Sequence, residues 1–138
     1  MKQEIELVRL VGDERRVGPT LESVSRHWQG KKERFLFISP HDDDVVLGGG
    51  LLLQLARMED VPVHIIIVTD GAMGYCSIEE KDAIADIRRQ EAIACYQLLG
   101  VSKENITFVG FPDCQLGAYR GHRLAAADLE LQPSEVYS

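Results

Sequence analysis

The segment of the sequence best suited to chemistry is a histidine followed by three aspartates, His41 to Asp44. Adjacent carboxylates repel one another unless a cation or the N-terminus of a helix compensates their charge. A bound metal ion is the economical explanation, because one imidazole with carboxylate oxygens suits zinc or a similar divalent ion. His41 and Asp44 are three residues apart and can face one side where a turn tightens into a helix. We therefore expect these two residues to be metal ligands.

Asp43, between those two residues, is left for another role. A carboxylate beside a metal-bound water can take its proton, because the metal lowers the pKa of that water toward about 7. Asp43 is therefore the candidate general base. The structural alternative is that Asp42 and Asp43 merely cap a helix, which acidic residues often do.

Two further aspartates follow apolar runs of the chain. Asp70 comes just after the run from Val63 to Val68, and Asp113 follows the run from Ile106 to Val109. In a parallel sheet, ligands bind outside the carboxyl ends of the strands, so both residues are expected near His41. Asp70 equally fits a turn residue before a glycine.

The elements that would position these residues alternate between strands and helices. The predicted strands are 35–38, 63–68 and 106–109, and their apolar runs indicate burial on both faces. A dense apolar segment predicts a helix over 44–58, and Ser77 with Glu80, a capping-box pattern, predicts a second helix over 78–99 that ends at Gly100. Right-handed crossovers then give an α/β fold, a Rossmann-like open parallel sheet with helices on both faces.

Residues 1–34 are expected to form an N-terminal arm, and residues 35–138 the sheet domain. Within the arm, the pattern predicts a strand over 5–11 and a helix over 20–29, with Thr20 as N-cap. After Asp113 the signal fades, apart from a weak helical pattern over 124–131. The length of 138 residues predicts one core.

The middle of the second predicted helix carries two charged residues of interest. The apolar stripe at helical spacing would place Glu91 on the buried face, where an unpaired carboxylate is costly. Arg88, one turn earlier, is the expected partner of Glu91. The alternative is that Arg88 or Glu91 reaches the metal site.

Composition narrows the classes of partner and compartment. A formal net charge of -7 disfavours binding to nucleic acids and to anionic membranes. The three cysteines, Cys76, Cys95 and Cys114, form no CxxC pair, which indicates a reducing compartment. The N-terminus has no secretory pattern and no apolar stretch is long enough for a membrane span, so we expect a cytoplasmic protein.

Three other histidines are weaker candidates. His27 is interpreted as a surface helix residue and His64 as a strand residue. His122, in a loop-like segment after the third strand, is a less favoured candidate metal ligand.

Four segments taken together resemble the LmbE/PIG-L family of N-acetylglucosaminyl deacetylases, in the family's order and over about residues 35–116: SPHDDDVVLGGG, VTDGAMGY, RRQEAIACYQLLGV and FVGFPDCQL. The resemblance implies that His41 and Asp44 bind zinc and that Asp43 is the general base. It also implies that Arg88 and Asp113 help to bind the substrate. Asp42 stands where the family usually has proline, and Val45 where it usually has glutamate.

The activity implied by this resemblance is zinc-dependent hydrolysis of the acetamide of an N-acetylated sugar conjugate. The family takes its third zinc ligand from a downstream histidine-rich motif, and we expect that part of the family domain to be missing from this chain. The third ligand is then expected from the missing segment, from His122 or from another subunit of a homo-oligomer. Other divalent ions remain alternatives to zinc.

Two other functions stay open from the sequence. One is a noncatalytic fragment or module that binds a sugar or a metal. The other is a phosphatase of the haloacid dehalogenase type, because Asp42-x-Asp44 after a strand resembles its nucleophile motif and Thr69 resembles its second-strand hydroxyl. A dinucleotide-binding domain is weaker, since Gly48 to Gly50 lie within the predicted helix.

Overall fold

The structure is a computed structural model that describes residues 6–119. Two strands and a short helix come first: β1 (Leu7–Val11), β2 (Glu14–Gly18) and α1 (Leu21–Val24). The parallel unit follows: β3 (Phe35–Ser39), α2 (Asp44–Met58), β4 (Val63–Thr69), α3 (Ile84–Leu98) and β5 (Ile106–Phe111). His122, Ile5 and the segment 124–131 lie outside the described residues. Within the described residues, neither α2 nor α3 combines the length and the apolar character that a bilayer crossing requires.

The predicted open parallel α/β sheet is confirmed. Its strand order is β3-β4-β5, and both neighbouring pairs are parallel. Phe37 pairs with Ile65, and Ile65 pairs in turn with Ile106. All three strands therefore end at one edge, which is where the sequence places its acidic residues.

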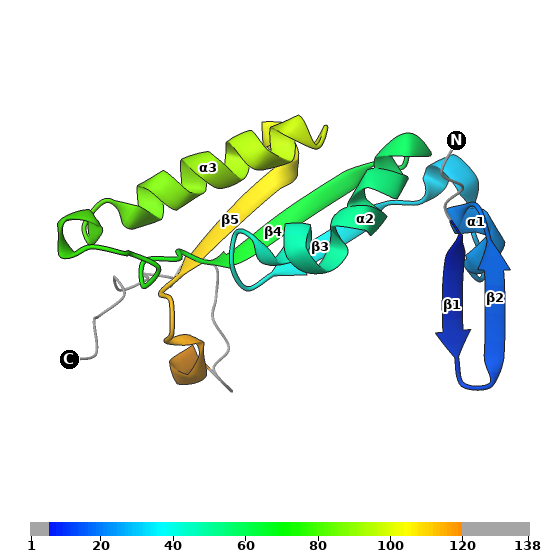
Figure 1. The fold of residues 1–138 in the computed structure, drawn as a ribbon, viewed down its shortest axis with the longest axis horizontal. Coiled ribbons are helices and arrows are strands. Elements are labelled where there is room, and N and C mark those ends of the chain that lie inside the picture. The colour runs from blue at the N-terminus through cyan, green and yellow to red at the C-terminus, as the bar shows by residue number, and fades with distance from the viewer. Residues whose placement is uncertain (1–5, 120–138) are drawn as a thin grey trace.

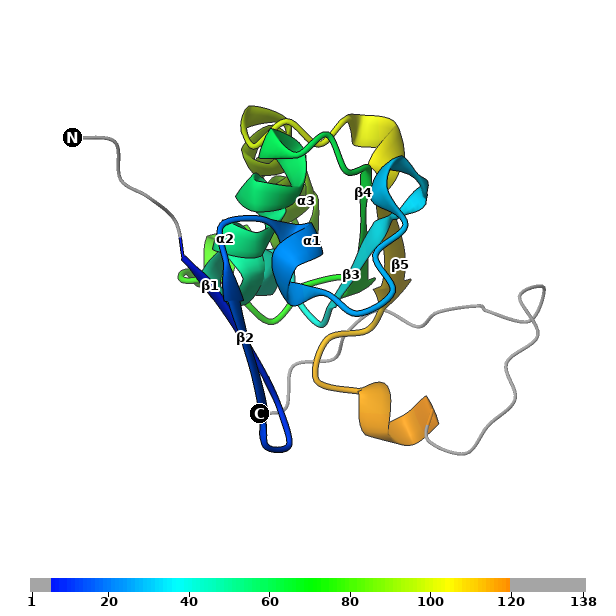
Figure 2. The same cartoon turned by 90° about the vertical axis from the view of Figure 1, so that its right-hand side faces the viewer.

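Both long helices pack on the same face of this sheet, whereas the sequence predicted helices on both faces. Figure 2 shows α2 and α3 together on one side of the strands. The opposite face, carrying Leu36 at 56% and Ile38 at 65% exposure, is open in the described part of the chain. The cause is the strand order: right-handed crossovers that advance across a sheet in one direction put every connecting helix on one face. An apolar run in a strand cannot reveal that order.

The core lies between this face and the two helices. Ile65 and Ile67 of β4, Leu53 of α2 and Tyr96 of α3 are almost completely buried in it. Gly49 permits the closest approach of α2, because a Cβ there would lie 3.1 Å from the Phe37 ring. Close contact with the sheet thus explains Gly49, but not its neighbours Gly48 and Gly50, where an added Cβ would meet nothing within 4 Å.

The helix α3 begins at Ile84, six residues later than predicted. Ser77 makes no side-chain capping bond, and a single 3-10 turn, Ile78–Glu80, replaces the first predicted turns. Ile78 is 68% exposed, whereas Ile84 is 8% exposed. A helical turn with no apolar contact gains little, so the helix starts where packing begins. The predicted end is confirmed, since Gly100 has φ +82° and Val101 N–H donates to the Tyr96 carbonyl at 2.9 Å.

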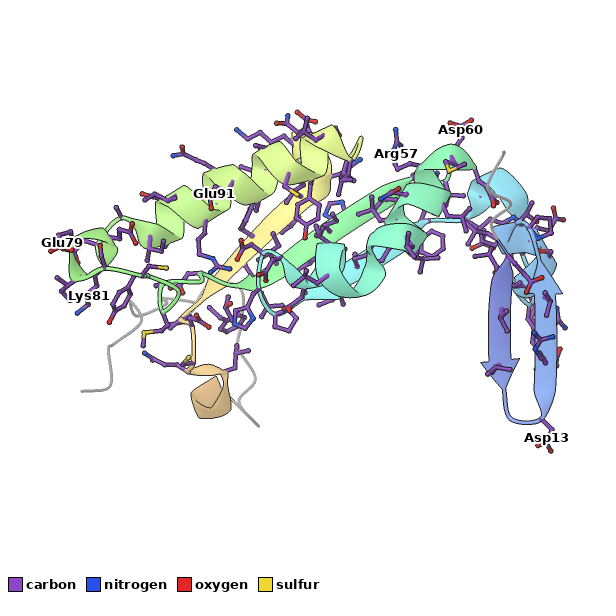
Figure 3. All side chains as sticks on the ribbon, viewed as in Figure 1. Asp13, Arg57, Asp60, Glu79, Lys81 and Glu91 are labelled. Carbon is purple, nitrogen blue, oxygen red and sulfur yellow. The ribbon has the colours of Figure 1, made fainter. Side chains whose placement is uncertain are left out.

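The buried face of α3 is not the predicted one. Glu91 is exposed and lies midway along the helix (Figure 3), and Leu98 is 89% exposed. The helix instead buries Ala92 and Tyr96 and turns Arg88 inward. The expected partnership of Arg88 with Glu91 is therefore wrong, because Glu91 needs no buried partner.

The β1-β2 hairpin lies at the end of the molecule remote from the carboxyl ends of the strands (Figure 1). Thr20 caps α1 as predicted, in a capping box with Ser23, but α1 ends at Val24. His27 has φ 58°, so it lies outside the helix in which the sequence placed it.

Candidate active site at the carboxyl edge of the sheet

Hydrogen bonds join the ends of β3 and β4 just before the acidic segment, His41 to Asp44. The Pro40 carbonyl accepts from Thr69 twice, from its backbone N–H at 2.9 Å and from its hydroxyl at 2.8 Å. The Ser39 hydroxyl donates to the His41 carbonyl at 2.6 Å. Ser39 and Thr69 are both buried, so these bonds are shielded from water. The backbone of His41 is therefore held in one place.

The His41 ring lies between two carboxylates. Its Nδ1 is 3.4 Å from Oδ2 of Asp44, and its Nε2 is 3.1 Å from Oδ1 of Asp113. The same Asp44 oxygen accepts the His41 backbone N–H at 2.9 Å. His41 and Asp44 are each a little over 40% exposed, whereas the side chain of Asp113 is 8% exposed. The structure thus brings together the two proposed ligands on the accessible side, with Asp113 behind the ring.

Asp43 occupies the N-cap position of α2 without acting as a cap. Its side chain makes no capping bond and is 56% exposed. Its only ion-pair partner among the described residues is Arg88, whose Nη2 is 3.8 Å from Oδ2. The proposal that Asp43 merely caps the helix is therefore wrong, and its carboxylate is accessible to solvent.

Asp42 has a different partner from its neighbours. Its Oδ1 accepts from Nε of Arg88 at 2.8 Å and from Nη2 at 2.5 Å, and its carbonyl accepts from the Tyr96 hydroxyl at 2.7 Å. Burial by itself lowers the pKa of Arg88, but the bond to Asp42 and the charges of Asp42, Asp43 and Asp113 outweigh it and raise that pKa. Arg88 is therefore a fixed cation beside the site. Sequence reasoning missed this pair, because the partners are 46 positions apart.

Asp70 and Asp113 link the loops that follow β4 and β5. Oδ1 of Asp70 accepts from the backbone N–H groups of Ala72 and Asp113, both at 3.0 Å. The first bond is the turn role that the sequence left open for Asp70. The second fixes the residue that orients His41.

The region near Arg88 also contains a cavity of about 190 Å³. Arg88 and Asp42 line it, together with Thr69, Asp70, Phe108 and Gly110. His41, Asp43 and Asp44 do not line this cavity, so it adjoins the pair of proposed ligands from the α3 side.

The residues on which the phosphatase alternative depended have other partners here. Asp42, its proposed nucleophile, is paired with Arg88 and its side chain is 15% exposed. The Thr69 hydroxyl donates to the Pro40 carbonyl. Both side chains line the cavity, but each is already engaged in one of these bonds and is not left free as a nucleophile or a phosphate contact should be.

The described residues supply two candidate ligands for a metal ion. No group of three or more histidine, cysteine, aspartate or glutamate side chains within residues 6–119 is arranged to hold one. His122 lies outside that range, so the structure does not place it. Among the other histidines, His64 is a strand residue as predicted, with Nε2 2.8 Å from the Thr107 hydroxyl.

Comparison with known proteins identifies the family of this site. The family model described as PIG-L, GlcNAc-PI de-N-acetylase, matches residues 36–132. An N,N'-diacetylchitobiose deacetylase from Pyrococcus horikoshii, solved with its inhibitor, is 32% identical with a TM-score of 0.56, over 64% of this chain and 33% of the deacetylase. This chain thus spans about a third of that protein. A search of curated proteins finds no match.

A second solved structure, the 4-carboxy-2-hydroxymuconate hydratase GalB from Pseudomonas putida, matches with a TM-score of 0.52 and 24% identity. The match covers 69% of this chain and 38% of the hydratase, and at this identity it supports the fold alone. One fold can carry several chemistries, so the family rests on the sequence model, which spans more than half of the chain. This chain belongs to the PIG-L family of GlcNAc-PI de-N-acetylases.

Proposed function

We propose that this site performs zinc-dependent hydrolysis of the acetamide of an N-acetylated sugar conjugate, with His41 and Asp44 as zinc ligands. The observation that carries the proposal is the separation of 3.4 Å between Nδ1 of His41 and Oδ2 of Asp44. Two ligand atoms about 2.1 Å from one zinc ion, at a tetrahedral angle, lie about 3.4 Å apart. The two side chains therefore fit one zinc ion.

The partner of the other ring nitrogen supports the same assignment. Zinc-ligating histidines almost always donate their second ring N–H to a carboxylate, a backbone carbonyl or water, which fixes the tautomer and the ring orientation. The Asp113 carboxylate, 3.1 Å from Nε2 of His41, suits this role. A catalytic zinc site ordinarily has three protein ligands, so the third ligand must come from outside residues 6–119 or from another subunit.

The chemistry divides between the metal and Asp43. A zinc ion held by these ligands would polarise the acetamide carbonyl and lower the pKa of a water molecule toward about 7. Asp43, exposed and not used as a cap, takes the proton from the attacking water. The same proton then goes to the departing nitrogen, so that acetate and a free amine leave.

The family and one solved relative support the proposed substrate class. The family name and the Pyrococcus horikoshii deacetylase both point to an N-acetylated amino sugar. Arg88 supplies hydrogen-bond donors beside the cavity, and these suit the hydroxyl oxygens of a sugar. Asp113 would contribute by holding His41 in place.

Product analysis tests this proposal. The purified chain is incubated with zinc and N,N'-diacetylchitobiose or another N-acetylglucosamine conjugate, and acetate and free amine are measured together. The proposal predicts both products in equal amounts and their loss when a chelator is added. Zinc binding without either product would instead support a module that binds metal or sugar but does not turn over, an alternative favoured by the two-ligand set of the described residues.

A further inference from the structure

Asp42 holds Arg88 in one orientation. A single carboxylate oxygen receives two of the guanidinium donors, and charge-assisted bonds between a guanidinium and a carboxylate are the strong class. Both side chains are mostly buried, with 15% of Asp42 and 24% of Arg88 exposed, so solvent screens the pair less than a surface pair.

Two glycines leave the space that the Arg88 side chain occupies. A Cβ at Gly71 would lie 3.2 Å from Nε of Arg88, and a Cβ at Gly74 would lie 2.4 Å from Nη1. A side chain at Gly74 would therefore displace the guanidinium. Asp42 is fixed in turn, because its carbonyl accepts the hydroxyl of the fully buried Tyr96. Arg88 is therefore in close contact with both this aspartate and the glycine turn.

The charge around Arg88 is more than compensated. Asp42 bonds to it directly, Asp43 lies at 3.8 Å, and Asp70 and Asp86 line the adjoining cavity, whose lining includes one further cation, Arg89. An anion would have to compete with a carboxylate already in place and approach several others, which Coulomb repulsion opposes. A neutral group rich in hydroxyls meets no such penalty.

We propose that Asp42 is a positioning residue that fixes Arg88 and neutralises its charge, so that this part of the site accepts neutral hydroxylated ligands and rejects anions. This inference about ligand class rests on the proposed sugar deacetylation, but the contact itself is tested without zinc or substrate. Asp42→Asn keeps the size of the side chain and removes its charge. Asp42→Glu keeps the charge and serves as the rescue variant.

The test uses the ¹⁵N NMR signal of the Arg88 Nε–H group, assigned by its absence in Arg88→Lys. In the wild-type chain this proton should exchange slowly with water, and sulfate should not shift the signal. In Asp42→Asn the exchange should be faster by about tenfold or more, because a charge-assisted bond has been lost. Sulfate should then shift the Arg88 signal with saturation, and Asp42→Glu should restore much of the wild-type behaviour.

Asp60→Asn is the matched control. It makes the same change of charge at the far end of α2 (Figure 3), and Asn tolerates the φ of 55° at that position. Fast exchange of Arg88 Nε–H in the wild type would overturn the proposal. A sulfate response of the wild type or of Asp60→Asn that equals the response of Asp42→Asn would also overturn it. The wild-type measurements decide even if Asp42→Asn does not fold. Absence of acetate release alongside slow exchange and no sulfate response would contradict the deacetylase function and leave the role of Asp42 supported.

Discussion

Nδ1 of His41 and Oδ2 of Asp44 face each other across 3.4 Å at the carboxyl edge of the sheet. The backbone produces this arrangement, since the same Asp44 oxygen accepts the His41 N–H and so closes the turn that starts α2. Because this bond is part of the fold, folding itself brings the two proposed ligands together and meets much of the cost of ordering them.

His41→Ala should lower the zinc content of the purified chain severalfold or more, because it removes one of the two proposed ligands. Elemental analysis after gel filtration measures this. His27→Asn is the control, since His27 is exposed and lies on the arm. Full zinc occupancy in His41→Ala would show that the ligand assignment is wrong.

Asp43→Asn should reduce acetate release by about 10²–10⁴-fold, the usual contribution of a general base, while zinc stays bound. The Asp43 side chain makes no capping bond, so the fold should tolerate the amide. Steady-state assays of acetate release, with zinc content measured on the same sample, separate the two effects. Asp82→Asn, at an exposed position before α3, provides the control for charge. A variant with wild-type turnover would remove Asp43 from the mechanism.

Tyr96→Phe should lower the free energy of unfolding by about 1–2 kcal/mol, because the Asp42 carbonyl loses a buried hydrogen bond. Urea denaturation measures the loss. Tyr75→Phe is the matched control, since Tyr75 is only partly buried. Equal stability of the two variants would mean that the Tyr96 hydroxyl does not secure the loop.

Tyr96 should also make the free energy of unfolding fall as the pH rises in the alkaline range. Burial, followed by nearby negative charges, raises the pKa of the Tyr96 hydroxyl above its ordinary value. Because the folded pKa is the higher one, this stabilisation is complete below about pH 10 and is lost above it, at up to about 1.4 kcal/mol per pH unit. The difference in unfolding free energy between wild type and Tyr96→Phe should therefore shrink as the pH rises beyond 10. A constant difference up to pH 11.5 would contradict this.

The glycines of α2 should respond differently to alanine. Gly48→Ala meets open space and should stabilise the fold by about 0.5–1 kcal/mol. Gly49→Ala places a Cβ 3.1 Å from the Phe37 ring, so it should gain less or destabilise. Thermal unfolding of the two variants compares them under identical conditions, and an equal gain at both sites would mean that α2 does not pack on Phe37 as the structure shows.

Local sequence signals predicted the parts of this molecule that depend on neighbouring residues. The three strands, the helix α2 and the glycine end of α3 were all visible as runs, periods and caps. The site cluster was also visible, because His41, Asp43 and Asp44 lie within one turn of chain after one strand.

Features that depend on distant residues were not predictable in this way. The side of the sheet covered by helices depends on strand order, and the partner of Arg88 depends on which face of α3 turns inward. The buried face of α3 is shifted by about one position from the predicted one. Glu91 is therefore on the surface, and Arg88 faces Asp42. Exposed Ile78 likewise shows that a capping pattern does not start a helix without packing.

The most direct test of the proposed zinc-dependent deacetylation is a zinc titration of the metal-free 138-residue chain while acetate release from an N-acetylglucosamine conjugate is followed. Activity should rise with added zinc and saturate at one ion per site, and His41→Ala should show neither the tight binding nor the activity. Saturable zinc binding with no acetate from any N-acetylated sugar, or acetate release that is unchanged in metal-free protein, would contradict it.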